Sequence, residues 1–306
     1  MIVVVGSIAF DTIETPFGRR ENILGGSAIY FSLAASILER VGIIGVVGED
    51  FTDEYLNYLK SKNIDIEGIK RVKGKTFHWD GYYEYDMNQA HTVKTELNVF
   101  ANFHPEIPAN YKNSEYLFLA NIDPELQIEV LNKFIRPKLV VADTMNYWIE
   151  KKRDKVLEVI RRTDVMLLND GEARELFKTP NILKAAKSVL NLGAKVVIIK
   201  KGEHGAIMFT RETIGSDEPF IAPAFPLEEV IDPTGAGDSF AGGFLSFLSK
   251  SGQINETSLR KAVIYATVLA SFTVMDFGPT QLDKVSYNEI KVRYNKLLSY
   301  TKFGKI

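Results

Sequence analysis

The sequence predicts an α/β protein: a three-layer α/β/α arrangement around a mostly parallel sheet, with a small additional β layer. Three observations support this prediction. Short apolar runs alternate with segments of helical periodicity along most of the 306 residues. Glycine or polar residues bound these apolar runs, as is typical of buried parallel strands. Two further stretches interrupt the alternation with strand periodicity, and they indicate hairpins that lie outside the main sheet.

The strands of the main sheet are expected wherever a short apolar run stands between two helical segments. They cover residues 2–5, 43–47, 116–120, 139–142, 165–168 and 196–200, and a shorter strand is expected to end at Val230 and Ile231. Helical periodicity covers residues 27–40, 51–62, 124–134, 152–162, 171–178, 181–192, 235–250 and 256–275. We expect a single domain over residues 1–306, because no linker or repeat divides the chain.

The two interrupting stretches are residues 12–24 and 75–99. The first is polar and contains a Pro-Phe-Gly turn, and in the second four aromatic residues alternate in the manner of a strand: Phe77, Trp79, Tyr83 and Tyr85. Large rings on one face require cover, so we expect the two hairpins to form one β layer over a site. The alternative is a pair of solvated surface hairpins.

Composition excludes several classes of protein. The chain is 45% hydrophobic and carries a formal net charge of −2, which argues against a nucleic-acid partner. The absence of cysteine excludes disulfides and thiolate metal sites, and the four histidines lack ligand spacing. No apolar run is long enough to span a membrane, and the first residues predict a buried strand rather than a signal peptide. We therefore expect a cytoplasmic protein without a membrane partner.

The most informative segment is residues 232–240, Asp-Pro-Thr-Gly-Ala-Gly-Asp-Ser-Phe. A glycine-rich turn that opens a helix presents unpaired N–H groups and the positive end of the helix dipole, which together bind anions. Asp238 places a carboxylate beside them. A base next to such an anion site is what phosphoryl transfer to an alcohol requires. The alternative is an ordinary strand-to-helix turn with a capping aspartate.

This string resembles the C-terminal signature of the ribokinase-like, or PfkB, family of carbohydrate and nucleoside kinases. The resemblance implies a ribokinase-like fold and ATP as phosphoryl donor. It also implies that Asp238 is the catalytic base and that the backbone of Gly235, Ala236 and Gly237 holds the transferring group. Residues 12–24 and 75–99 would then form a lid, which in this family often also joins two chains into a homodimer. The P-loop pattern of other nucleotide-binding proteins is absent.

Residues expected to hold the acceptor follow the first strands. The resemblance implies that Asp11 accepts hydrogen bonds from two hydroxyl groups of the acceptor, although Asp11 also suits the start of a hairpin. Gly25 and Gly26 match the family's glycine pair, or simply open a capped helix. Tyr30 stands where the family usually has an asparagine, so one substrate contact differs here. Two further acceptor contacts are expected from the lid and from the mouth of the sheet: Trp79 and Asn146.

Residues expected on the nucleotide side follow the later strands. Asn169 and Glu172 match a family motif implied to organise Mg²⁺, but the same spacing also predicts a helix capping box. Asp232 is a second candidate near the metal ion. Lys200 either neutralises phosphate charge or is a solvated lysine at a strand end. Three glycines are expected to shape the nucleotide site: Gly202, Gly205 and Gly278.

These features predict an ATP- and Mg²⁺-dependent kinase that phosphorylates a hydroxyl of a small sugar or polyol, such as an inositol. The close alternative is a nucleoside kinase, in which Tyr30, Phe31 and Trp79 stack on a base. A non-catalytic sensor of the same fold is a third hypothesis, and its mark would be loss of the base or of the anion site. Hydride transfer is disfavoured because the first strand is not followed by Gly-x-Gly-x-x-Gly.

Overall fold

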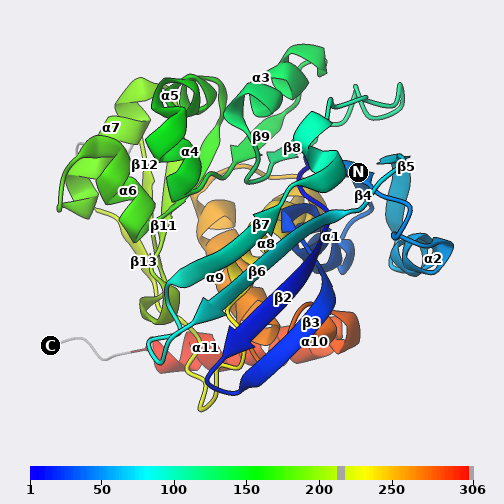
Figure 1. The fold of residues 1–306 in the computed structure, drawn as a ribbon. Helices are drawn as coiled ribbons and strands as arrows, with labels where there is room; N and C mark the ends of the chain where they lie inside the picture. The colour runs from blue at the N-terminus through cyan, green and yellow to red at the C-terminus, as the bar shows by residue number, and fades with distance from the viewer. Residues whose placement is uncertain (212–217, 303–306) are drawn as a thin grey trace, which may run out of the picture.

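The structure is a computed structural model that describes residues 1–211 and 218–302. It contains a nine-stranded sheet and a separate four-stranded sheet (Figure 1). The predicted fold class, a mostly parallel sheet between helical layers with a small β lid, is confirmed. In spatial order, the main sheet consists of β13 (Phe220–Ala222), β12 (Ala206–Thr210), β11 (Val196–Lys200), β10 (Val165–Asn169), β9 (Leu139–Ala142), β8 (Tyr116–Leu119), β1 (Ile2–Val5), β4 (Val41–Val47) and β5 (Ile64–Arg71).

All pairs from β11 to β5 are parallel, whereas β12 pairs antiparallel with both β11 and the edge strand β13. Alternate residues of each strand enter the two cores, as strand periodicity requires. In β1, Ile2 and Val4 belong to one core, and Val3 and Val5 to the other. This two-sided burial explains the unbroken apolar runs in the sequence.

One core lies between the sheet and a helical layer that contains α1 (Ser27–Ser36), α2 (Asp53–Ser61), α8 (Ala236–Ser251), α9 (Glu256–Thr273), α10 (Thr280–Lys284) and α11 (Tyr287–Tyr300). The other core lies beneath α3 (Pro124–Lys133), α4 (Asn146–Lys151), α5 (Arg153–Arg162), α6 (Asp170–Phe177) and α7 (Ile182–Leu192). Two 3₁₀ turns complete the described elements: η1 (Asn98–Asn102) and η2 (Gly202–His204).

The second sheet has the order β3 (Gly18–Gly25), β2 (Ala9–Thr15), β6 (Phe77–Tyr83) and β7 (Ala90–Glu96). Both hairpins form as the sequence predicts, and the parallel pair β2–β6 joins them into one layer. Figure 1 shows this layer as a separate sheet, with β2 and β3 in blue and β6 and β7 in cyan. We call it the lid.

Several elements differ from the sequence prediction. The sequence did not predict strands β5, β12 and β13. β5 and β13 lie at the two edges of the sheet and carry polar or exposed residues, whereas β12 lies between β13 and β11 and is mostly buried. No strand ends at Val230 and Ile231, because the N–H groups of Ile231 and Asp232 both donate to the carbonyl of Val274 in a contact between two loops. Tyr85 lies outside β6 and is 92% exposed, so it does not share the covered face of the other aromatic residues. No helix in the described residues has the length and apolar character needed to cross a membrane.

Candidate active site

Polar residues at the carboxyl ends of parallel strands meet the start of α8. Asn169 and Lys200 are the last residues of the neighbouring strands β10 and β11, and Asp143 directly follows β9. A Cβ added to Gly237, in the first turn of α8, would lie 3.0 Å from Lys200 Nζ. The structure therefore brings the glycine-rich signature to the carboxyl ends of the strands, where open α/β folds bind ligands.

The first turn of α8 is the candidate anion site. Gly235 adopts the left-handed conformation at φ 74°, and no side chain makes a capping hydrogen bond at the start of the helix. Main-chain N–H groups in the first turn are therefore left for a ligand. The Ala236 N–H donates to the Pro233 carbonyl at 3.2 Å, which closes the turn. Ala236 thus shapes the turn with its amide, and the amides that follow it are the expected anion donors.

Asp238 is a half-buried carboxylate within this first turn. Burial, and secondly the negative charge of Asp143, raise its pKa to about 7, and Lys200 acts in the opposite direction. A carboxylate with a pKa near neutral is suited to take a proton from an alcohol during the reaction. This environment agrees with the role predicted for Asp238, which stays a prediction until it is tested.

Lys200 forms an ion pair with Asp143 in which Nζ and Oδ2 are 2.6 Å apart. Burial lowers the pKa of Lys200, but Asp143 and Glu172 outweigh burial and hold the pKa above its ordinary value. Lys200 is therefore a fixed cation beside Gly237 rather than a solvated lysine at a strand end. The sequence did not predict the pairing, although both residues stand at the ends of parallel strands that are two apart in the sheet.

Asp11 lies on β2 at the root of the lid and is 4% exposed. Burial raises its pKa to about 7, a hydrogen bond from the Gly26 backbone opposes this, and Asp232 and Asp238 raise it further. A Cβ at Gly25 would lie 1.9 Å from Asp11 Oδ2, so only glycine allows this contact. The glycine pair and Asp11 therefore form one unit, and the acceptor contacts that the resemblance implies for them stay a prediction.

Three aromatic residues lie near this unit or near the glycine-rich turn. Tyr30 on α1 is 1% exposed, and a Cβ added to Gly235 would lie 2.2 Å from its ring. Tyr83 on β6 accepts a hydrogen bond of 3.3 Å from Thr234 Oγ1. Trp79 pairs with Asp11 in the parallel register of β2 and β6, so both side chains point to the same face of the lid. Its Nε1 donates to Thr92 Oγ1 on β7 at 3.1 Å.

Asn169 and Glu172 form the capping box that was the alternative to a metal role. The Glu172 N–H donates to Asn169 Oδ1, and the Asn169 N–H donates to Glu172 Oε2, each at 2.7 Å. Burial, and then Asp143, raise the pKa of Glu172 to about 8. The described residues contain no cluster of three or more His, Cys, Asp or Glu side chains arranged around a cation. Mg²⁺ retains most of its water and needs few protein ligands, so the single buried carboxylate of Glu172 is still compatible with a Mg²⁺ site.

Asp232 is fully buried, and both of its oxygens already accept main-chain hydrogen bonds. Oδ1 accepts from the Thr234 N–H at 2.9 Å, and Oδ2 accepts from the Gly278 N–H at 3.0 Å. The carboxylate thereby braces the anion-binding turn against the loop after α9. These contacts favour a positioning role, and its predicted proximity to a metal ion stays a prediction.

The remaining predicted glycines shape the loops around the site. Gly202 and Gly278 have φ of 54° and 63°, and a Cβ on either would meet the lid: Asn88 Oδ1 at 2.5 Å and Ile23 Cγ2 at 2.4 Å, respectively. Gly205, with φ of 85°, lies against the carbonyl of Ala222. Both ends of the lid therefore rest on glycines. Asn146, by contrast, is exposed at the start of α4 and is not brought into the buried cluster.

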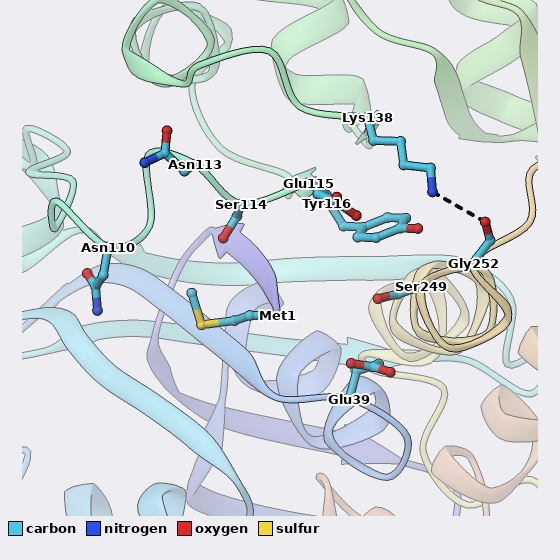
Figure 2. A pocket seen from close by; sticks show the side chains of 10 residues that line it. All are labelled: Met1, Glu39, Asn110, Asn113, Ser114, Glu115, Tyr116, Lys138, Ser249 and Gly252. Atoms are coloured by element: carbon cyan, nitrogen blue, oxygen red, sulfur yellow. Dashed lines mark hydrogen bonds between the residues drawn. The ribbon is translucent and has the colours of Figure 1, made fainter.

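A separate surface hollow of about 440 Å³ lies at the amino ends of the strands, away from the candidate site (Figure 2). Its lining includes Met1, Tyr116 and Lys138, which lie at the amino ends of β1, β8 and β9. Lys138 Nζ bridges across it to the Gly252 carbonyl at 3.3 Å (Figure 2). The hollow contains none of the predicted site residues.

Comparison with known proteins agrees with this geometry. Residues 1–284 match the family described as pfkB family carbohydrate kinase. The chain belongs to the PfkB family. It is similar to a cytidine kinase from Thermococcus kodakarensis, with 33% identity over 260 residues that cover 83% of this chain and 91% of the relative. A nucleoside kinase from Methanocaldococcus jannaschii is 26% identical over 293 residues, 93% of this chain and 89% of the relative.

Solved structures of other kinases have the same fold as this PfkB-family kinase. The crystal structure of the Methanocaldococcus jannaschii nucleoside kinase matches with a TM-score of 0.76 at 23% identity, covering 97% of this chain and 99% of that one. The nucleoside kinase of Burkholderia thailandensis in complex with ADP-inosine matches with a TM-score of 0.80 at 19% identity, covering 100% and 98%. At these identities the likeness establishes the fold, and the choice of substrate rests on other grounds.

Proposed function

We propose that this kinase transfers the γ-phosphoryl group of ATP to a hydroxyl group of a nucleoside. One observation carries the choice of nucleoside: the cytidine kinase of Thermococcus kodakarensis is 33% identical across 83% of this chain. The site is compatible with that choice, because Trp79 pairs with Asp11 across the lid strands and the charge of Asp11 contributes to raising the pKa of both Tyr30 and Tyr83. Aromatic rings suit a base, and a carboxylate suits the vicinal hydroxyls of a ribose.

The residues of the chain then divide the reaction between them. Asp11 and the backbone at Gly25 and Gly26 hold the acceptor. As the acceptor oxygen attacks the γ-phosphorus, its proton passes to the carboxylate of Asp238 and the bond to the β-phosphate oxygen breaks, releasing ADP. The amides at the start of α8 and the ammonium of Lys200 stabilise the negative charge that develops on the transferring group.

Mg²⁺ belongs to the same proposal. Three carboxylates, the buried Asp143 and Glu172 and the half-buried Asp238, share one fixed ammonium, Lys200, and the pKa values of Glu172 and Asp238 are raised. A further cation at this corner would be stabilised by that excess of carboxylates. When bound, Mg²⁺ neutralises phosphate charge, and Glu172 is the residue we expect to hold it through its water shell.

The sugar or polyol acceptor placed first by the sequence stays open as a second candidate. Asp11 suits a sugar or polyol as well as a nucleoside, because any vicinal diol can donate two hydrogen bonds to its carboxylate. Base recognition distinguishes the two candidates: a nucleoside kinase requires the base, whereas a sugar kinase accepts the free sugar. The non-catalytic hypothesis lacks its expected mark, because the structure retains both the carboxylate of Asp238 and the uncapped start of α8.

ADP release measured with ATP and Mg²⁺ against a panel of acceptors tests the proposal. The panel contains cytidine, uridine, adenosine, inosine, ribose, fructose, myo-inositol and fructose 6-phosphate. We expect turnover with at least one ribonucleoside and much slower turnover with ribose. Turnover with a sugar or polyol alone would contradict the nucleoside assignment, and silence toward every acceptor would favour the sensor. Sedimentation velocity tests the homodimer, which we likewise propose to form through the lid.

A further inference from the structure

The hydroxyl of Tyr30 is buried but unpaired. Tyr30 lies in the first turn of α1, where its N–H donates to the Gly26 carbonyl at 3.2 Å, and its side chain is 1% exposed. Among residues 1–211 and 218–302, its oxygen has no hydrogen-bond partner. Buried hydroxyl groups in native proteins are nearly always paired. An unpaired one inside a binding site therefore points to a partner that arrives with the ligand.

The position of the ring identifies the ligand as the acceptor. The ring lies against Gly235, which opens the helix that carries Asp238, while the backbone of Tyr30 is tied to the glycine pair beneath Asp11. Tyr30 thus lies between the proposed anion site and the glycine pair of the proposed acceptor site. Burial first, and then the charges of Asp232 and Asp11, hold the pKa of Tyr30 well above its usual value. The phenol keeps its proton at neutral pH and can donate it in a hydrogen bond.

We propose that Tyr30 determines specificity by donating a hydrogen bond to a sugar hydroxyl of the nucleoside, while that same hydroxyl donates to Asp11. A hydroxyl group has one proton to donate and two lone pairs to accept with, so it can join a phenol to a carboxylate. This inference rests on the proposed function and deepens it, because it assigns the ribose, rather than the base, to Tyr30. A ligand that lacks this hydroxyl leaves both Tyr30 and Asp11 without a partner.

Tyr265 provides a matched control. It is 3% exposed on α9, its hydroxyl likewise has no partner among the described residues, and its ring packs on Phe247, 5.5 Å between centroids. Burial and Tyr287 raise the pKa of Tyr265, and none of the site carboxylates contributes to that shift. Removing either hydroxyl deletes one unpaired buried group, but only Tyr30 lies beside Gly235.

The test is a cycle that combines a protein substitution with a substrate substitution. Steady-state kinetics are measured for the native enzyme, Tyr30→Phe and Tyr265→Phe with cytidine, 2′-deoxycytidine and 3′-deoxycytidine. We expect Tyr30→Phe to lower kcat/KM for cytidine by about 10-fold and to leave the KM for ATP unchanged. One of the two deoxynucleosides should be a poor substrate of the native enzyme and should lose little more in Tyr30→Phe, because the interaction is already absent. Tyr265→Phe should match the native enzyme throughout.

Thermal melting of the unliganded variants separates this role from a structural one. If the hydroxyl serves only the ligand, Tyr30→Phe melts no lower than the native protein. An unchanged kcat/KM for cytidine, or an equal loss for all three nucleosides, overturns the inference. Activity toward a sugar but toward no nucleoside overturns the proposed function alone. The same cycle with that sugar and its deoxy derivatives then decides the role of Tyr30.

Discussion

Thr234 Oγ1, in the anion-binding turn, donates a hydrogen bond of 3.3 Å to the hydroxyl of Tyr83, in lid strand β6. The two residues are 151 positions apart in the sequence, and their contact joins the lid to the glycine-rich turn. Ile23 on β3 packs on Gly278 at the other side of the lid, and Asp232 hydrogen-bonds to the backbone of both Thr234 and Gly278. One buried carboxylate thus supports the two places where the lid rests on the catalytic layer.

Tyr83→Phe should loosen the lid without altering Asp238, the proposed catalytic base. Losing one hydrogen bond of this kind costs about 1 kcal/mol, roughly a five-fold change in the closed population. We expect a several-fold rise in the acceptor KM and in ADP release without acceptor, because water then reaches the site more often. The measurement is ADP release with and without acceptor. Unchanged hydrolysis without acceptor would show that the contact does not hold the lid closed.

Asp238→Asn should abolish most of the activity and preserve the binding of ATP. Loss of a general base lowers the rate by about 10²–10⁴-fold. Calorimetric titration with a non-hydrolysable ATP analogue provides the control, since an intact anion site still binds the phosphates. Turnover close to that of the native enzyme would exclude Asp238 from the role of base. In the native enzyme, kcat/KM should rise with pH through about 7 as Asp238 loses its proton.

Lys200→Met should destabilise the protein as well as inactivate it. It leaves Asp143 buried without its partner, which costs about 3–5 kcal/mol of unfolding free energy. Adding Asp143→Asn removes the stranded charge, so the double variant should recover much of the lost stability in urea denaturation while remaining inactive. If the double variant is no more stable than Lys200→Met, the ion pair is not the source of the loss.

Gly235→Ala and Gly252→Ala compare the two ends of α8. Both glycines are left-handed, at φ of 74° and 66°, so alanine meets a similar backbone cost of about 1 kcal/mol at each. A Cβ at Gly235 also collides with the Tyr30 ring, whereas none of the described atoms lies within 4 Å of a Cβ at Gly252. We expect urea denaturation to show about 1–3 kcal/mol more destabilisation for Gly235→Ala. Equal losses would show that Tyr30 gives way freely.

The unliganded protein should lose stability as pH rises through neutrality. Folding raises the pKa of Asp11 and Asp238 to about 7 and that of Glu172 to about 8, so the folded state binds protons more tightly than the unfolded chain does. The stabilisation from these protons is complete below about pH 4 and is lost as pH rises through 7 to 8. Thermal melting from pH 5 to 9 measures this loss, and Asp238→Asn should reduce the slope. A native profile that is flat above pH 6 would contradict the raised pKa values.

Sequence reasoning succeeded where one local signal determined the structure. The unbroken apolar runs located β1, β9 and β11 with their observed bounds, and the aromatic alternation located the β6–β7 hairpin. The missed strand β5 lies at an edge and contains Asp65, Glu67, Lys70 and Arg71, so its pattern resembles that of a loop. Its position depends on pairing with β4, which no local pattern specifies.

The candidate site was predictable to the same extent. The residues after each strand could be listed from the sequence, because the carboxyl ends of parallel strands converge. Their partners could not be listed: the pairing of Lys200 with Asp143 and the contact of Tyr83 with Thr234 both join distant parts of the chain. Asn169 and Glu172 show the converse, since their spacing suited both a cap and a metal site, and the structure shows the cap.

The parallel pairing of β2 with β6 also has a consequence for the order of folding. The chain makes α1, β4, α2 and β5 between these two strands, so the lid sheet cannot assemble until that intervening part has returned to its place. Contacts of long sequence separation generally form late, and the least supported regions open first. We therefore expect the lid to be the last part of the molecule to form and the first to unfold on heating, while the main sheet and its helices remain folded.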